Sequence, residues 1–135
     1  MGNENMENHK LFKISQNAVI QNSAGAILIL QKDGKWILPG GRLENKSWLQ
    51  GLKREVKEET GIENFEVKEI LNVDTSDGDE TYIVTFLCTV VEIPQVTLSS
   101  EHQEYAWLKL DEIERYEFWH EKIKERLKLL LRLRQ

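Results

Sequence analysis

The chain of 135 residues has little of three features that assign many proteins to a class. A single cysteine, Cys88, excludes an intramolecular disulfide and suits a reducing compartment such as the cytoplasm. No apolar run approaches the ~20 residues that a membrane span requires, and the polar first ten residues predict no signal peptide. There is also no basic surplus, because the formal net charge is −5, which argues against a general nucleic-acid-binding protein. We expect a cytoplasmic protein without nucleic-acid or membrane partners.

The composition predicts one compact domain. Hydrophobic residues make up 40% of the chain and charged residues 30%, as in folded globular proteins. The length suffices for one core and is too short for two ordinary domains. Repeats, linkers and low-complexity segments are not visible. We therefore predict a loose tail over residues 1–10 and a single domain over residues 11–135.

Strand and helix signals alternate along the chain. Strands are predicted over residues 11–20, 26–30, 36–38, 65–73, 81–91 and 104–108. Ser47 is a good N-cap and Gln50 completes a capping box, so a helix is predicted from Trp48 to Thr60, with Gly61 as its stop. A second helix is expected from Asp111 to the end. The pattern predicts an α/β fold with a mixed sheet.

The helix over residues 48–60 carries an unusual acidic group. At about 100° per residue, Glu55, Glu58 and Glu59 fall within roughly 100° of arc. Carboxylates crowded in this way repel one another, so their grouping indicates a cation among them. Mg²⁺ and Mn²⁺ fit, because hard divalent cations prefer oxygen ligands. The alternative is a solvated surface helix with ordinary i, i+4 charge pairs, which composition alone does not exclude.

The residues around this helix carry a specific resemblance. Gly40-Gly41, a loop with Glu44 and the run REVKEETGI over residues 54–62 resemble the signature of the Nudix hydrolases. The resemblance implies a Nudix-like α/β/α sandwich, in which the box helix and a C-terminal helix pack on a mixed sheet. It also implies a loop–helix–loop that binds a divalent metal, Mg²⁺ or Mn²⁺, against the diphosphate of a substrate.

The resemblance implies roles for individual residues. Glu58 and Glu59 would be metal ligands, with the Gly40 carbonyl near the metal. Glu55 would be a ligand or the general base, and Arg54 would orient the carboxylates.

The sequence departs from the family pattern at one position. Counted back from Arg54, the position of an upstream glutamate is occupied by Lys46, and the interval from Gly41 to Lys46 is one residue short. Lys46 either contacts a substrate phosphate or points to solvent. Gly41 and Arg42, which adjoin the box, are further candidates for substrate binding, although an exposed arginine is the simpler interpretation of Arg42.

A second segment also resembles part of the family. Residues 99–107 match the S-x-E-H-x-x-x-x-W pattern of many nucleotide-directed Nudix proteins, in which a loop glutamate approaches the metal from outside the box. Glu101 is therefore a candidate fourth ligand or alternative base. The competing interpretation is an exposed loop acid.

Together these features predict a metal-dependent hydrolase that cleaves the phosphoanhydride of a nucleoside diphosphate derivative. Nucleoside triphosphates and dinucleoside polyphosphates are the leading substrate classes. One alternative is a non-catalytic Nudix-fold module that binds a nucleotide. Another is a P-loop NTPase, since residues 40–47 nearly spell G-x-x-x-x-G-K-[ST], although Asn45 replaces the second glycine.

The leucines of residues 123–133 exceed what one packed helix face needs. This surplus predicts a homodimer contact. A basic helix lying on a membrane surface is the alternative.

Overall fold

The structure is a computed structural model that describes residues 9–44, 47–76, 78 and 80–133. Its elements in chain order are β1 (Lys13–Gln21), β2 (Ile27–Lys32), β3 (Lys35–Ile37), β4 (Gly40–Arg42), α1 (Trp48–Thr60), β5 (Glu66–Ser76), β6 (Thr81–Thr89), β7 (Glu104–Leu108), the 3₁₀ helix η2 (Leu110–Arg115) and α2 (Glu121–Leu133).

The strands form one mixed seven-stranded sheet. Its main order is β3-β2-β1-β6-β5, with β4 paired to β1 and β7 paired to β2. β1 and β6 run parallel, from Lys13 opposite Thr81 to Gln21 opposite Thr89. The other pairings are antiparallel.

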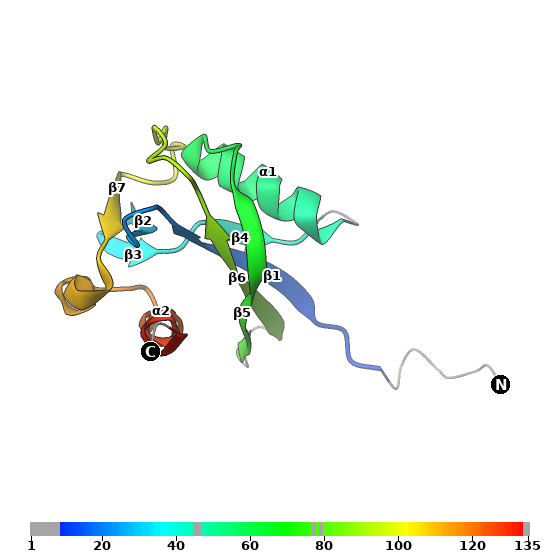
Figure 1. Cartoon of the computed structure of the whole chain (residues 1–135). Coiled ribbons are helices and arrows are strands. Elements are labelled where there is room, and N and C mark those ends of the chain that lie inside the picture. The colour runs from blue at the N-terminus through cyan, green and yellow to red at the C-terminus, as the bar shows by residue number, and fades with distance from the viewer. Residues whose placement is uncertain (1–8, 45–46, 77, 79, 134–135) are drawn as a thin grey trace.

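One α-helix covers each face of the sheet (Figure 1). Leu52 and Val56 of α1 join a buried cluster with Phe86 on one face. Leu127 and Leu130 of α2 join a second cluster on the other face. Alternate residues of β2 supply both clusters, because successive side chains of a strand point to opposite faces. The predicted α/β/α sandwich is confirmed.

Helix α1 has the predicted bounds and caps. The Ser47 hydroxyl accepts a hydrogen bond from the Gln50 N–H at 3.2 Å. Gly61 ends the helix with a φ of 77°, and its N–H donates to the Lys57 carbonyl. A left-handed residue of this kind is typical of a helix C-terminus.

Two predictions about the elements are wrong. No strand was predicted between residue 38 and the first helix, but Gly40–Arg42 is strand β4, paired with Ser15, Gln16 and Asn17 of β1. The helix expected from Asp111 onward is divided into η2 and α2. The segment between them is extended because it pairs with β3: the Trp36 N–H donates to the Glu117 carbonyl, and the Trp119 N–H donates to the Trp36 carbonyl.

Within the described part of the chain, no helix combines the length and apolar character needed to cross a membrane. The buried residues Ile123, Leu127 and Leu130 place one face of α2 on the sheet. Leu131 is exposed, so part of the predicted leucine surplus lies at the surface. Whether it forms a homodimer contact stays a prediction.

Candidate functional site

The acidic residues of α1 lie together beside the glycine pair of β4. The Gly40 N–H donates to Glu59 Oε1 at 2.8 Å. Arg54 Nη2 lies 3.2 Å from Glu55 Oε1, which orients that carboxylate. Glu58 is exposed, and Glu59 is half-buried. The predicted acids are therefore grouped in space, with a main-chain donor on one of them and a guanidinium on another.

The Glu55 side chain leaves no room for a side chain at position 41. A Cβ atom added at Gly41 would lie 2.7 Å from Glu55 Oε2, well inside van der Waals contact. Any larger residue would therefore displace the Glu55 carboxylate. Gly41 was predicted to bind substrate, and the structure places it directly against an acid of the site.

The loop that carries Glu101 is tied to the end of α1. The Thr97 N–H donates to the Thr60 carbonyl at 2.8 Å, and the Ser99 N–H to the Glu59 carbonyl at 3.4 Å. Glu101 is exposed, yet its charge acts on both Glu55 and Glu59. The loop acid is therefore near enough to the helix acids for their charges to interact, and its role as a ligand or base stays a prediction.

Glu44 is a further acid near the site, and sequence reasoning did not assign it a role. Its Oε2 lies 3.9 Å from Arg54 Nη2, and its charge acts on Glu55. The signal for it was the shortened interval after Gly41. Lys46, the residue that occupies the upstream glutamate position, lies outside the described residues.

Burial and the charges of neighbouring acids raise the pKa values of Glu55 and Glu59. Burial, opposed by the Gly40 N–H and reinforced by the charges of neighbouring glutamates, raises the pKa of Glu59 to about 7. Burial also raises the pKa of Glu55, against the opposing effect of Arg54. A carboxylate pair that resists ionisation is stabilised by an added cation, because an opposite charge favours the ionised form.

The donor set fits a hard cation by its chemistry, since it consists of carboxylate oxygens and the main-chain carbonyls of β4. Among the described residues, no three acidic, histidine or cysteine side chains already stand close enough together to hold an ion. Glu58, the exposed member of the predicted acidic group, would have to turn toward Glu55 and Glu59 for the three to hold a cation together.

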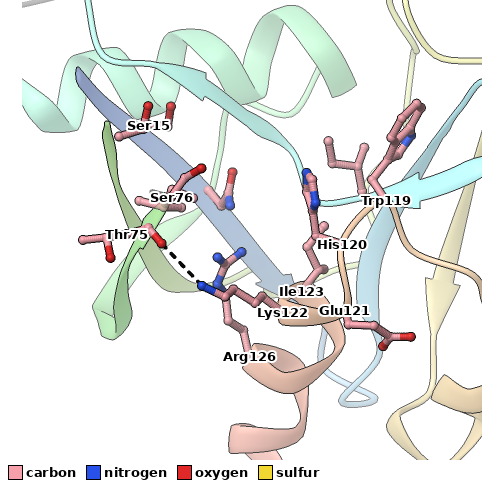
Figure 2. A pocket seen from close by; sticks show the side chains of 13 residues that line it. Ser15, Thr75, Ser76, Trp119, His120, Glu121, Lys122, Ile123 and Arg126 are labelled. Carbon is pink, nitrogen blue, oxygen red and sulfur yellow. Dashed lines mark hydrogen bonds between the residues drawn. The ribbon is translucent and has the colours of Figure 1, made fainter. Parts of the chain in front are cut away.

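A polar cavity of about 620 Å³ opens on the α2 side of the sheet (Figure 2). Its wall residues come from β1, β3, β5, β6, α2 and the segment just before α2. They include Ser15 and Asn17 of β1, Thr75 and Ser76 of β5, Thr81 of β6, Trp119 and His120 before α2, and Lys122 and Arg126 of α2.

The cavity adjoins the acidic group through the β1–β4 pairing. Asn17 lies opposite Gly40, and Ser15 lies opposite Arg42. Arg42 is exposed, as the simpler interpretation held, but its register places it beside a cavity residue. The sequence did not reveal this cavity.

Comparison with known proteins identifies the family. Residues 11–127 match the NUDIX domain family, so the chain belongs to this family, and its enzyme class is that of the Nudix-type pyrophosphohydrolases. The alternative P-loop interpretation is wrong for the same reason.

Several relatives are similar over much of the chain. The nucleoside triphosphatase NudI of Escherichia coli O139:H28 is 28% identical, over 73% of this chain and 83% of its own length. The crystal structure of the MutT protein of Methanosarcina mazei Go1 is 29% identical with a TM-score of 0.77, over 94% of this chain and 98% of that one. The 8-oxo-dGDP phosphatase NUDT18 of Danio rerio is 46% identical over a shorter match. This match covers 34% of this chain and 16% of the length of NUDT18.

Proposed function

We propose that this protein is a divalent-metal-dependent hydrolase that cleaves the phosphoanhydride of a nucleoside diphosphate derivative. Nucleoside triphosphates and dinucleoside polyphosphates are the substrate classes to test first. The observation that carries the proposal is the group of carboxylates with raised pKa values beside a polar cavity wide enough for a nucleoside. The similarity to nucleoside triphosphatase NudI supports the substrate class.

In this proposal the cation is held by Glu58, Glu59 and the Gly40 carbonyl, with Glu55 as a further ligand. When bound, Mg²⁺ or Mn²⁺ supplies charge neutralisation and Lewis acidity toward the diphosphate. The raised pKa values of Glu55 and Glu59 support this arrangement, because a nearby positive charge favours the ionised form that burial disfavours.

The remaining residues of the site bind substrate and move a proton. Glu55 or Glu101 accepts the proton of the attacking water, as a general base must. Arg54 holds Glu55 in position through the contact of 3.2 Å. Arg42 and Lys46 bind phosphate oxygens. The nucleoside occupies the cavity that Ser15 and Asn17 line, because these residues pair with β4 next to the acids.

A substrate panel with a matched pair of variants tests the proposal. The panel contains nucleoside triphosphates, oxidised purine triphosphates, dinucleoside polyphosphates, ADP-ribose and nucleotide sugars, each with Mg²⁺ or Mn²⁺. Glu58→Gln should remove nearly all turnover without loss of folding. Glu63→Gln, which changes an exposed acid paired with Lys57 outside the acidic group, should retain it.

The second candidate function is a non-catalytic module that binds a nucleotide. The lysine at position 46, where the family pattern has a glutamate, favours it. A folded protein that binds panel members without metal and hydrolyses none of them would establish this candidate. The cytoplasmic location and the division into a tail and one domain stay predictions.

A further inference from the structure

Arg126 is a buried cation on the wall of the α2-side cavity. Its exposed fraction is only 4%. Nη2 lies 3.3 Å from Asp74 Oδ2, whereas Nε is enclosed and has no hydrogen-bond partner among the described residues. In Figure 2 the guanidinium points from α2 toward the strands that form the opposite wall. A buried guanidinium without its full set of acceptors is costly, so an acceptor delivered by a ligand would be favourable.

The charge around Arg126 is not balanced. Asp74 also contacts Lys122, whose Nζ lies 3.6 Å from Oδ1, so one carboxylate serves two cations. Asp74 itself does not line the cavity, and the only acid among the described wall residues, Glu121, is exposed, with its side chain pointing away from the guanidinium (Figure 2). This part of the cavity therefore favours a ligand that presents acceptors.

Most of the other polar wall residues do not distinguish donors from acceptors. Ser15, Thr75 and Ser76 carry hydroxyl groups that both donate and accept, and the Asn17 amide does the same. Lys122 and Arg126 carry donors and no acceptor. The Lys122 ammonium is exposed and already contacts Asp74 and the Thr75 carbonyl, whereas the guanidinium of Arg126 is buried and lacks its full set of acceptors. Arg126 is therefore the wall residue best placed to reject a ligand edge that presents donors.

We propose that Arg126 makes the cavity selective for nucleobases with a carbonyl at the edge that they present, 6-oxopurines and 4-oxopyrimidines, over 6-amino and 4-amino bases. A carbonyl oxygen accepts from the guanidinium, as guanine O6 does from arginine in other complexes. An amino group on the base would place its N–H opposite the guanidinium N–H, and both donors would be left without an acceptor. The inference rests on the proposed function in one respect: it takes the nucleoside to enter this cavity.

The test compares bases that differ only at this edge. Inosine and adenosine 5′-monophosphates form one pair, and uridine and cytidine 5′-monophosphates form the other. Their dissociation constants are measured by calorimetry on the full chain without metal. We expect the oxo member of each pair to bind about tenfold more tightly or better, since a site that hydrogen-bonds a group discriminates strongly against its absence.

Two variants and a control assign the effect to Arg126. Arg126→Met keeps the length of the side chain but removes its donors, and it should bring the two members of each pair within about twofold. Arg126→Lys keeps the charge without the fork of donors and supplies a second test if the methionine variant does not fold. Lys122→Met removes the other cation that contacts Asp74 and should leave the preference intact.

A spectroscopic readout reports on the side chain itself. The ¹H–¹⁵N resonance of the Arg126 Nε–H should shift on addition of inosine monophosphate and shift less with adenosine monophosphate. Equal affinities within the pairs, an unchanged preference in Arg126→Met, or no binding of any monophosphate would overturn the inference. The binding measurement requires neither metal nor turnover, so it tests base selection even if the protein hydrolyses no substrate. If the protein is an active hydrolase but shows no base preference, this inference is refuted and the proposed function is not.

Discussion

Strand β1 lines two cavities with alternate residues. Ser15 and Asn17 face the polar α2-side cavity of about 620 Å³, whereas Ile14 and Gln16 face a second cavity of about 480 Å³ on the α1 side. The α1-side cavity is bordered mainly by apolar residues, including Trp48, whose ring stacks on Phe86 at 4.9 Å. The two cavities are of similar size and differ in chemistry.

The volumes of the two cavities therefore do not distinguish which of them is suited to a ligand. A ligand site needs convergent polar groups that fix orientation, and these lie on the α2 side, next to β4 and the acids. The α1-side cavity exists because α1 begins at Trp48 and leaves the adjoining part of the sheet uncovered.

Gly41→Ala should break the link between β1 and the acids. The new Cβ would meet the end of the flexible Glu55 side chain, which can move, so the fold should survive while the carboxylate is displaced. We expect kcat to fall on the order of 100-fold, the usual cost of a misplaced reacting group, with KM changed little. Gly78→Ala, whose Cβ meets nothing within 4 Å, is the control. Normal kcat in Gly41→Ala would exclude this role for the glycine.

Filling each cavity from the same strand should separate their functions. Ser15→Trp obstructs the α2-side cavity, and we expect KM to rise about tenfold or more, equal to at least 1.4 kcal/mol of lost binding. Ile14→Trp fills the α1-side cavity and should leave KM and kcat unchanged. Steady-state kinetics on the best panel substrate, with thermal unfolding as a folding check, measures both. The reverse result would assign the substrate to the α1 side.

The metal-free protein should lose stability as the pH rises through neutrality. The pKa of Glu59 is raised from 4.5 to about 7, so the folded state binds more protons than the unfolded state in this window. Its stabilising contribution is full below pH 4.5 and lost as the pH rises through 7. We expect the Tm to fall by on the order of 5 °C between pH 5.5 and 8.

Glu59→Gln isolates that effect. Burial lowers the pKa of His102, which acts in the opposite direction, so the difference between the two proteins reports Glu59 alone. Mg²⁺ should restore the Tm of the wild-type protein at pH 8, because a ligand that binds the folded state stabilises it. Parallel melting curves of the two metal-free proteins would contradict the assignment.

Trp48→Ala gives the smallest expected effect. Trp48 is half-exposed and stacks on Phe86, so its removal should cost roughly 1 kcal/mol of unfolding free energy. Turnover should stay within about twofold of wild type, since the α1-side cavity holds no substrate in our proposal. Denaturant titration and kinetics on one sample measure both quantities.

The features predicted correctly depend on residues close together in the chain. Helix α1 and its ends were predictable because Ser47, Gln50 and Gly61 act within one turn of the helix. The grouping of Glu55 and Glu58 followed from helical period alone. Their roles in chemistry stay predictions, and so does that of Lys46.

The features that were missed depend on distant partners. Strand β4 has two glycines, which are poor strand formers, and it exists because β1 pairs with it. The break before α2 arises from pairing with Trp36, far back in the chain. The α2-side cavity has walls from β1, β5, β6 and α2, and Arg126 looked like an ordinary charge in a leucine-rich helix. No local pattern places it beside Asp74.

The parallel pairing of β1 with β6 sets an order of assembly. It joins Lys13 to Thr81, so its contacts span about half of the chain and are slow to close. The glycine pair and the acidic helix, by contrast, lie within 61 residues of the N-terminus and contact β1 directly. During synthesis the acids are therefore made well before α2. Arg126, which we propose selects the base, is therefore made after the acids of α1 and joins a site whose acidic half already exists.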